Sequence, residues 1–159
     1  MKQLIKAMAA ALVILQVLSI NCECSTTKDK EKYIEYIEEI CNEYDCSPEL
    51  IQAIIEREST WNPNAKNGGC KGLMQINEKW HKERMKKLQV KSLYDPYGNI
   101  LVGVDYIMEL ANTYEDIGTV LNIYNAGTNG LKLAKKGKYL DYTKKVIARA
   151  TELQEEKRQ

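Results

Sequence analysis

Helical spacing of apolar residues over most of the chain is the feature that most limits its possible folds. Such residues recur every three or four positions near both ends of the pattern: Ile34, Ile37, Ile40 and Cys41, and later Tyr142, Val146, Ala150 and Leu153. This spacing places them on one face of a helix. Only 3 prolines are present in the 159 residues. We therefore predict a single, mainly α-helical domain.

The boundaries of several elements follow from their end signals. We expect helices over 30–44, 47–59, 78–88, from Asn99 to about Ala111, over 116–124, and around 142–153. Ser47 supplies a capping hydroxyl, and Pro48 suits the first helical position. A loop is expected over 62–71 and a short extended segment over 72–77. Gly103 would allow close packing of its helix.

The N-terminal residues resemble an export signal. Lys2 and Lys6 precede the apolar run 7–20, which is short for a membrane span. We predict a signal peptide over 1–19, a short tether over 20–30 and the folded domain over 31–159. A lipid anchor at Cys22 and an uncleaved N-terminal anchor are the alternatives. The expected location is outside the cell or in its envelope, with no membrane contact beyond this segment.

Charge and cysteine content limit the possible ligands. The net charge of +1 gives no indication of nucleic-acid binding. The chain has one histidine, His81, and no CxxC pair, so we expect neither a metal nor another cofactor. Cys41 falls on the apolar face of its helix and is predicted to be a buried free thiol. An exported chain can form disulfides, and Cys46 with Cys70 is the preferred pair.

Glu58 stands out because it shares a helical face with three isoleucines, Ile51, Ile54 and Ile55. Glu56 is expected to point to the opposite, solvent-facing side. Glu58 also lies at the predicted end of its helix, where its carboxyl group can open into a cleft. Partial burial would raise the pKa of this carboxyl group, as a general acid that works near neutral pH requires.

The residues after Glu58 are suited to binding sugars. The segment from Ser59 to Gln75 contains amides at Asn62, Asn64, Asn67 and Gln75 but no further Asp or Glu. Amides can bind hydroxyl and N-acetyl groups, and the flat rings of the 10 tyrosines can stack on sugars. One protonated carboxylic acid among amides and aromatic rings indicates cleavage of a glycosidic bond.

Four motifs in order resemble the catalytic core of the soluble lytic transglycosylase family, which is related to goose-type lysozymes. They are Glu58-Ser59 with Trp61-Asn62-Pro63 and Gly72-Leu73-Met74-Gln75; Leu93-Tyr94-Asp95-Pro96 with Asn99-Ile100 and Gly103; Tyr124-Asn125-Ala126-Gly127; and Tyr142 with Val146. The resemblance covers about 46–150. Many relatives carry a stretch with serine and proline just before Gly72-Leu73-Met74-Gln75, where this chain has Lys66-Asn67-Gly68-Gly69-Cys70, a loop apparently one residue shorter.

The resemblance implies a lysozyme-like helical fold and peptidoglycan glycan strands as the substrate; separately, we expect a monomer. The resemblance also assigns catalysis to Glu58. The residues that it places at the sugar cleft are Ser59, Met74, Gln75, Tyr124, Asn125 and Tyr142, and Asn67 is the candidate to replace the serine that many relatives carry.

The absence of a nearby second acid indicates a reaction in which the substrate supplies the nucleophile. Glu58 would act alone as acid and then base, and would leave 1,6-anhydroMurNAc ends. Asp95 and Glu83 are later acids that folding can bring close, so water attack by a goose-lysozyme-like hydrolase remains the main alternative. A sugar-binding wall module without turnover, and a structural envelope protein with a salt-bridged Glu58, are the others.

Overall fold

A computed structural model describes residues 27–159 of the chain. The predicted signal peptide and most of the predicted tether therefore lie outside the described residues. The chain divides into two units, Met1–Tyr33 and Ile34–Gln159. Of the first unit only residues 27–33 are described, and they are helical. All features discussed below belong to the second unit.

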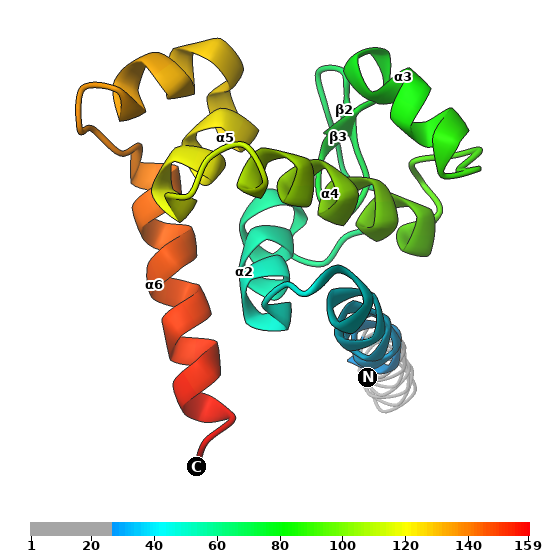
Figure 1. The fold of residues 1–159 in the computed structure, drawn as a ribbon. Helices are drawn as coiled ribbons and strands as arrows, with labels where there is room; N and C mark the ends of the chain where they lie inside the picture. The colour runs from blue at the N-terminus through cyan, green and yellow to red at the C-terminus, as the bar shows by residue number, and fades with distance from the viewer. Residues whose placement is uncertain (1–26) are drawn as a thin grey trace, which may run out of the picture. The chain divides into compact units, whose positions relative to one another are not determined.

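The second unit consists of helices and one small sheet, as predicted (Figure 1). Residues 34–44 at the start of this unit are helical. The elements that follow are α2 (Pro48–Ser59), β1 (Lys66–Asn67), β2 (Cys70–Lys71), β3 (Ile76–Asn77), α3 (Glu78–Lys87), α4 (Pro96–Ala111), α5 (Ile117–Ala134) and α6 (Asp141–Glu156). Within residues 27–159, no helix is both long and apolar enough to cross a membrane.

Helix α2 begins and ends as its sequence predicts. The Ser47 Oγ accepts a hydrogen bond of 3.2 Å from the Leu50 N–H, and Pro48 occupies the first helical position. Thr60 ends the helix in the left-handed conformation, with φ 52°. The buried face consists of Ile51, Ala53, Ile54 and Ile55. This helix packs along α6, whose buried residues include Tyr142, Val146 and Ala150.

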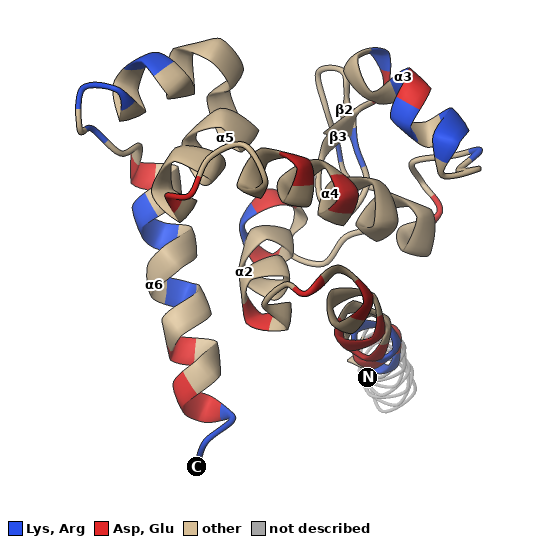
Figure 2. Cartoon of the chain, viewed as in Figure 1, with Lys and Arg blue, Asp and Glu red and all other residues tan. Residues whose placement is uncertain are grey.

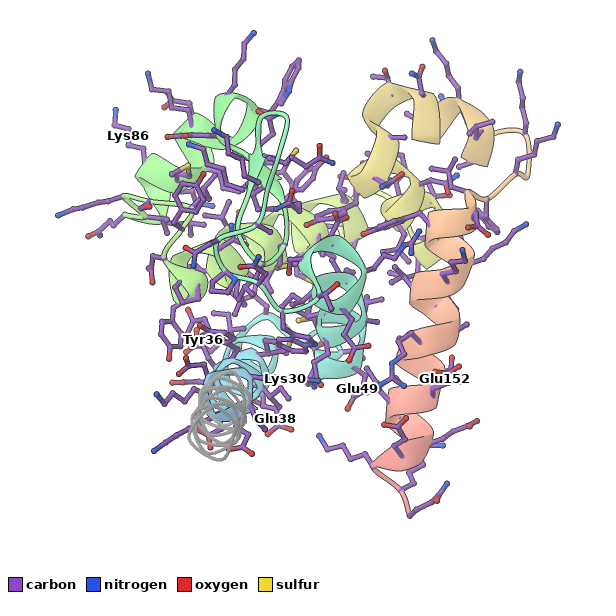
Figure 3. All side chains as sticks on the ribbon, turned by 180° about the vertical axis from the view of Figure 1, so that it is seen from behind. Lys30, Tyr36, Glu38, Glu49, Lys86 and Glu152 are labelled. Atoms are coloured by element: carbon purple, nitrogen blue, oxygen red, sulfur yellow. The ribbon has the colours of Figure 1, made fainter. Side chains whose placement is uncertain are left out.

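Glu56 does not face open solvent, so that prediction is wrong. Its Oε2 accepts a 2.8 Å hydrogen bond from the Arg149 Nε, and only 25% of its side chain is exposed. Arg149 on α6 also contacts Glu152 and Glu156, and Figure 3 shows Glu152 on that helix. The prediction failed because helical spacing gives the direction of a side chain but not which helix lies on that side.

The loop predicted over 62–71 contains two short strands. The sheet has the order β1-β2-β3, is antiparallel, and pairs Asn67 with Cys70 and Cys70 with Asn77. Gly68 lies in the tight connection with φ 57°, a conformation that glycine adopts readily. The segment 72–77 is extended only at β3, because residues 72–75 form turns.

Asn99 fixes the turn at residues 72–75 to the body of the domain. Its side chain is fully buried, accepts a 2.7 Å hydrogen bond from the Met74 N–H, and donates to the carbonyls of Lys71 and Leu93 at 2.8 and 3.0 Å. Helix α4 begins at Pro96, three residues before the predicted start, because the Asp95 carboxylate caps it at the Gly98 N–H.

Two glycines, one in α4 and one in α5, allow close packing of their helices against neighbouring segments. A Cβ atom on Gly103 would lie 2.3 Å from the Met74 sulfur, so the predicted close packing at Gly103 is confirmed. Helix α5 was predicted to stop at residues 125–127. Its backbone breaks at Gly127 (φ 54°, ψ −132°), but helical structure then resumes to Ala134. Gly130 allows the resumed helix to approach residue 122, because a Cβ atom added at position 130 would lie 1.9 Å from the Asn122 carbonyl oxygen.

Candidate active site

A cleft of about 1050 Å³ brings together segments that are far apart in the sequence. It is lined by Glu58 from α2, Asn67, Cys70, Gln75, Ile76 and Asn77 from the sheet region, Trp80, His81, Glu83, Arg84 and Lys87 from α3, Tyr106 and Glu109 from α4, and residues 123–128 of α5. Of the three glutamates in this lining, Glu58 is partly buried, whereas Glu83 and Glu109 are exposed.

Glu58 lies in the last turn of α2, where the isoleucine face of the helix reaches the cleft. Burial raises the pKa of its carboxyl group above the ordinary value, while Tyr142 and the Arg57 charge lower it to a smaller extent. The predicted rise is therefore confirmed. No carboxylate of the described residues contributes to this shift.

Tyr142 reaches Glu58 from α6. Only 9% of Tyr142 is exposed, and its hydroxyl group makes no direct hydrogen bond within residues 27–159. The hydroxyl group lies near enough to Glu58 to interact with its carboxyl group, and burial together with nearby Tyr124 and Glu58 raises the Tyr142 pKa. Tyr142 does not line the cleft, so the residue predicted to bind sugar lies behind Glu58, where its hydroxyl group can act on the carboxyl group.

Tyr124 and Gln75 line the cleft together with Glu58. The Tyr124 hydroxyl group donates a 2.7 Å hydrogen bond to the Met74 carbonyl oxygen. Burial and the Glu58 charge hold the pKa of Tyr124 well above its usual value, so its phenol stays neutral. The Gln75 Nε2 donates to the carbonyls of Ala65 and Gly72 at 3.1 and 2.9 Å. These two bonds use the NH₂ group of the side chain and fix the orientation of the amide.

The other predicted sugar-binding residues separate into two groups. Asn67 and Asn125 line the cleft. Met74 does not line it, because its side chain is fully buried against Gly103. Ser59 is also absent from the lining residues, and its Oγ donates to the Ile55 carbonyl oxygen at 3.2 Å. Met74 acts through its backbone, which accepts from Tyr124, rather than through its thioether.

The predicted disulfide between Cys46 and Cys70 does not form. Both cysteines are free, as is the buried Cys41, whose predicted state is confirmed. The Cys46 N–H donates a 2.9 Å hydrogen bond to the Cys41 carbonyl oxygen at the helix end. Cys70 instead lies on β2 at the cleft, where it acts on the pKa of Tyr124. Tertiary placement thus separates two cysteines that sequence alone suggested as a pair.

The wall formed by α3 and α4 was not predicted from the sequence. Figure 2 shows basic residues on α3 and acidic residues on α4. Arg84 joins the two helices through ion pairs with Asp105 and Glu109. The cleft-lining positions Trp80, Arg84 and Lys87 recur at helical spacing, and this spacing could have indicated that one face of the helix lines a cleft. The face was not recognised because a charged helix usually indicates a solvent-facing surface.

The later acids occupy different positions. Glu83 lines the cleft, whereas Asp95 caps α4. Glu109 also lines the cleft but is bound to Arg84. Within the described residues, no group of three or more His, Cys, Asp or Glu side chains is arranged to hold a metal ion.

The fold and the cleft define a lysozyme-like helical domain that presents one half-buried glutamate. The family model described as Transglycosylase SLT domain matches residues 35–147. The chain therefore belongs to the transglycosylase SLT domain family.

Curated relatives agree with this assignment. The chain is 34% identical to the transglycosylase of Enterobacteria phage PRD1 over 97 residues, covering 60% of this chain and 35% of the relative. It is 34% identical to the membrane-bound lytic murein transglycosylase C of Yersinia enterocolitica over 95 residues, covering 55% and 26%. It is 30% identical to the invasion protein IagB of Salmonella typhimurium over 129 residues, covering 74% and 72%. The chain thus matches about a third or less of the first two relatives.

Solved structures show the same fold. The lytic transglycosylase Slt of Pseudomonas aeruginosa superposes with a TM-score of 0.63 and 21% identity, covering 73% of this chain and 23% of that one. The 70 kDa soluble lytic transglycosylase of Escherichia coli gives a TM-score of 0.58, also at 21% identity and with the same coverage. The predicted lysozyme-like fold is therefore confirmed.

Proposed function

We propose that this chain is a peptidoglycan lytic transglycosylase that cleaves the β-1,4 bond between MurNAc and GlcNAc. The observation that carries this proposal is Glu58, a carboxylic acid with a raised pKa that lines a large polar and aromatic cleft. Family membership and the names of the relatives support the same substrate. The cell envelope is the corresponding location, in agreement with the expected signal segment.

Glu58 acts first as an acid. Its carboxyl group donates the proton to the glycosidic oxygen, and the bond between that oxygen and C1 of MurNAc breaks. The N-acetyl oxygen of the same MurNAc supports the positive charge at C1. Burial suits Glu58 to this step because it keeps the proton on the carboxyl group at a pH where an exposed glutamate has lost it.

The same group then acts as a base. The Glu58 carboxylate removes the proton from the 6-hydroxyl group of MurNAc, and O6 bonds to C1 to give the 1,6-anhydro sugar. Glu58 regains its proton and no water is consumed. Two observations favour this route over hydrolysis: no described carboxylate acts on the Glu58 pKa, and Glu109 is engaged by Arg84. A hydrolytic route that uses a second carboxylate to activate water would have to use Glu83, the remaining acid in the cleft lining.

The mass of the product tests this proposal. Purified peptidoglycan digested with the chain is expected to release fragments with anhydroMurNAc ends, each lighter by one water than the hydrolysis product. Mass spectrometry after complete digestion reads this difference directly. Reducing MurNAc ends as the sole product would instead assign a hydrolase that uses Glu58 and water.

Tyr142→Phe is expected to separate stability from activity. The buried Tyr142 hydroxyl group acts on Glu58 and makes no other hydrogen bond within residues 27–159, so its removal should change the free energy of unfolding by no more than about 1 kcal/mol. The turnover rate should fall about tenfold, because the hydroxyl group supports the Glu58 carboxylate that forms during the reaction. Urea unfolding and a wall-digestion assay measure the two effects.

The pH profile of Tyr142→Phe provides the control. Tyr142 lowers the Glu58 pKa, so its loss should raise that pKa and move the alkaline limb of kcat/KM to higher pH. An unchanged profile together with full turnover would show that Tyr142 does not act on Glu58.

A further inference from the structure

Trp80 is the most exposed large apolar side chain among residues 27–159. It is 77% exposed, whereas the other large apolar residues at the surface are 38–42% exposed. Single exposed apolar residues are common and need no function. Trp80 differs because it lines the same cleft as Glu58. Its indole ring is therefore accessible to a ligand in the cleft.

The backbone of α3 favours this placement. Helical geometry breaks at His81, where φ is −112° and ψ is 17°. Trp80 and His81 both line the cleft, although neighbouring residues of a regular helix point about 100° apart. The Arg84 ion pairs to Asp105 and Glu109 hold this part of α3 against α4. Trp80 thus projects from a wall that is fixed in position.

A row of rings leads from Glu58 toward Trp80. Tyr124 is close enough to Glu58 for the carboxylate to raise its pKa, and the Tyr124 and Tyr106 rings are 5.7 Å apart. Tyr106 in turn contacts His81 at 4.5 Å between ring centroids. Trp80 follows as the sequence neighbour of His81. All of these residues line the same cleft, so we expect a glycan that reaches Trp80 to extend beyond the sugar at Glu58.

We propose that Trp80 forms a distal subsite in which its indole ring stacks on an N-acetylated amino sugar of the bound glycan strand. This inference rests on the proposed function, because it takes the same β-1,4 glycan as the ligand. The C–H groups on one face of a sugar ring provide an apolar surface for the indole, and Asn77 and Glu83 offer polar groups nearby. Trp80 would therefore determine how strongly longer strands bind, without taking part in bond cleavage.

Calorimetric titration in a Glu58→Gln background tests the subsite without turnover. The two probes are peptide-free glycan strands of at least six sugars and the GlcNAc-MurNAc disaccharide. Adding Trp80→Leu is expected to weaken strand binding about tenfold and to leave disaccharide binding unchanged. Trp80→Tyr should retain most of the strand affinity, since it keeps a flat ring. Tyr94→Ala is the matched control, because Tyr94 is 38% exposed but does not line the cleft.

Three results would overturn the subsite: equal strand affinity with and without the indole ring, equal weakening of both probes, and no binding of strands by the Glu58→Gln parent. Kinetics of otherwise unaltered protein give an independent readout, with a raised KM for strands and an unchanged kcat expected for Trp80→Leu. If Glu58→Gln still digests walls while Trp80→Leu loses strand affinity, the catalytic assignment fails and the subsite stands.

Discussion

Glu58→Gln is expected to reduce the rate of peptidoglycan digestion about 10³-fold. General acid–base catalysis typically contributes 10²–10⁴-fold, and here one carboxyl group supplies both the acid and the base. Glutamine keeps the size and polarity of the side chain but cannot donate the proton to the glycosidic oxygen. Release of soluble muropeptides from purified walls measures the effect. Undiminished digestion would remove Glu58 as the catalytic acid.

The stability of Glu58→Gln serves as its control and has a definite sign. Burial raises the folded-state pKa of Glu58, so folding favours the protonated form. Wild-type stability therefore decreases as the pH rises from the ordinary glutamate pKa through the raised one. Glutamine carries no charge and escapes this loss. The variant should match the wild type at about pH 4 and unfold at higher urea concentration at about pH 7. Lower stability at neutral pH would show that the Glu58 carboxylate is stabilised by a partner, as a structural role predicts.

Asn99→Leu is expected to lower the free energy of unfolding by about 3 kcal/mol or more. Leucine has a similar size but leaves the Met74 N–H and the carbonyls of Lys71 and Leu93 without their buried partner. Each unsatisfied group costs about 1–3 kcal/mol. Urea unfolding followed by circular dichroism measures the loss. Catalysis should decrease as well, because Gln75 and the Met74 carbonyl oxygen belong to the same turn.

Asn64→Ala is the matched control for Asn99→Leu. Asn64 is exposed in the nearby loop, so its replacement should change the free energy of unfolding by no more than about 0.5 kcal/mol. A similar small change for Asn99→Leu would mean that other groups or water satisfy the turn, and that Asn99 is not its anchor.

Local signals predicted the elements that depend on neighbouring residues. Ser47 and Pro48 set the start of α2, and the spacing of its isoleucines correctly placed Glu58 at a partly buried position with a raised pKa. Gln75, Tyr124 and Asn125, which the resemblance assigns to sugar binding, line the cleft, and their contact with sugar stays a prediction. These predictions succeeded because capping and helical spacing operate within one or two turns.

Contacts between distant segments were outside the reach of this reasoning. Glu56 meets Arg149, which is 93 residues away, and no local pattern indicates that ion pair. Met74 was placed at the cleft by its motif, but Gly103 makes room to bury it. Trp80 was overlooked because its charged neighbours on α3 suggested a solvated helix. In each case the arrangement of a second element decided the outcome.

The closure of the loop at Ala65 and Gly72 has a consequence for engineering. The Ala65 carbonyl oxygen accepts from the Gly72 N–H at 2.9 Å and from the Gln75 Nε2 at 3.1 Å. Asn99 holds the chain just beyond this closure. Strand β2 inside this closure also pairs with β3, and the Lys71 carbonyl oxygen accepts from Asn99, which leaves only the tip around Gly68 outside these contacts. We expect changes at that tip, next to the cleft residue Asn67, to alter substrate preference while Glu58 and Gln75 keep their positions.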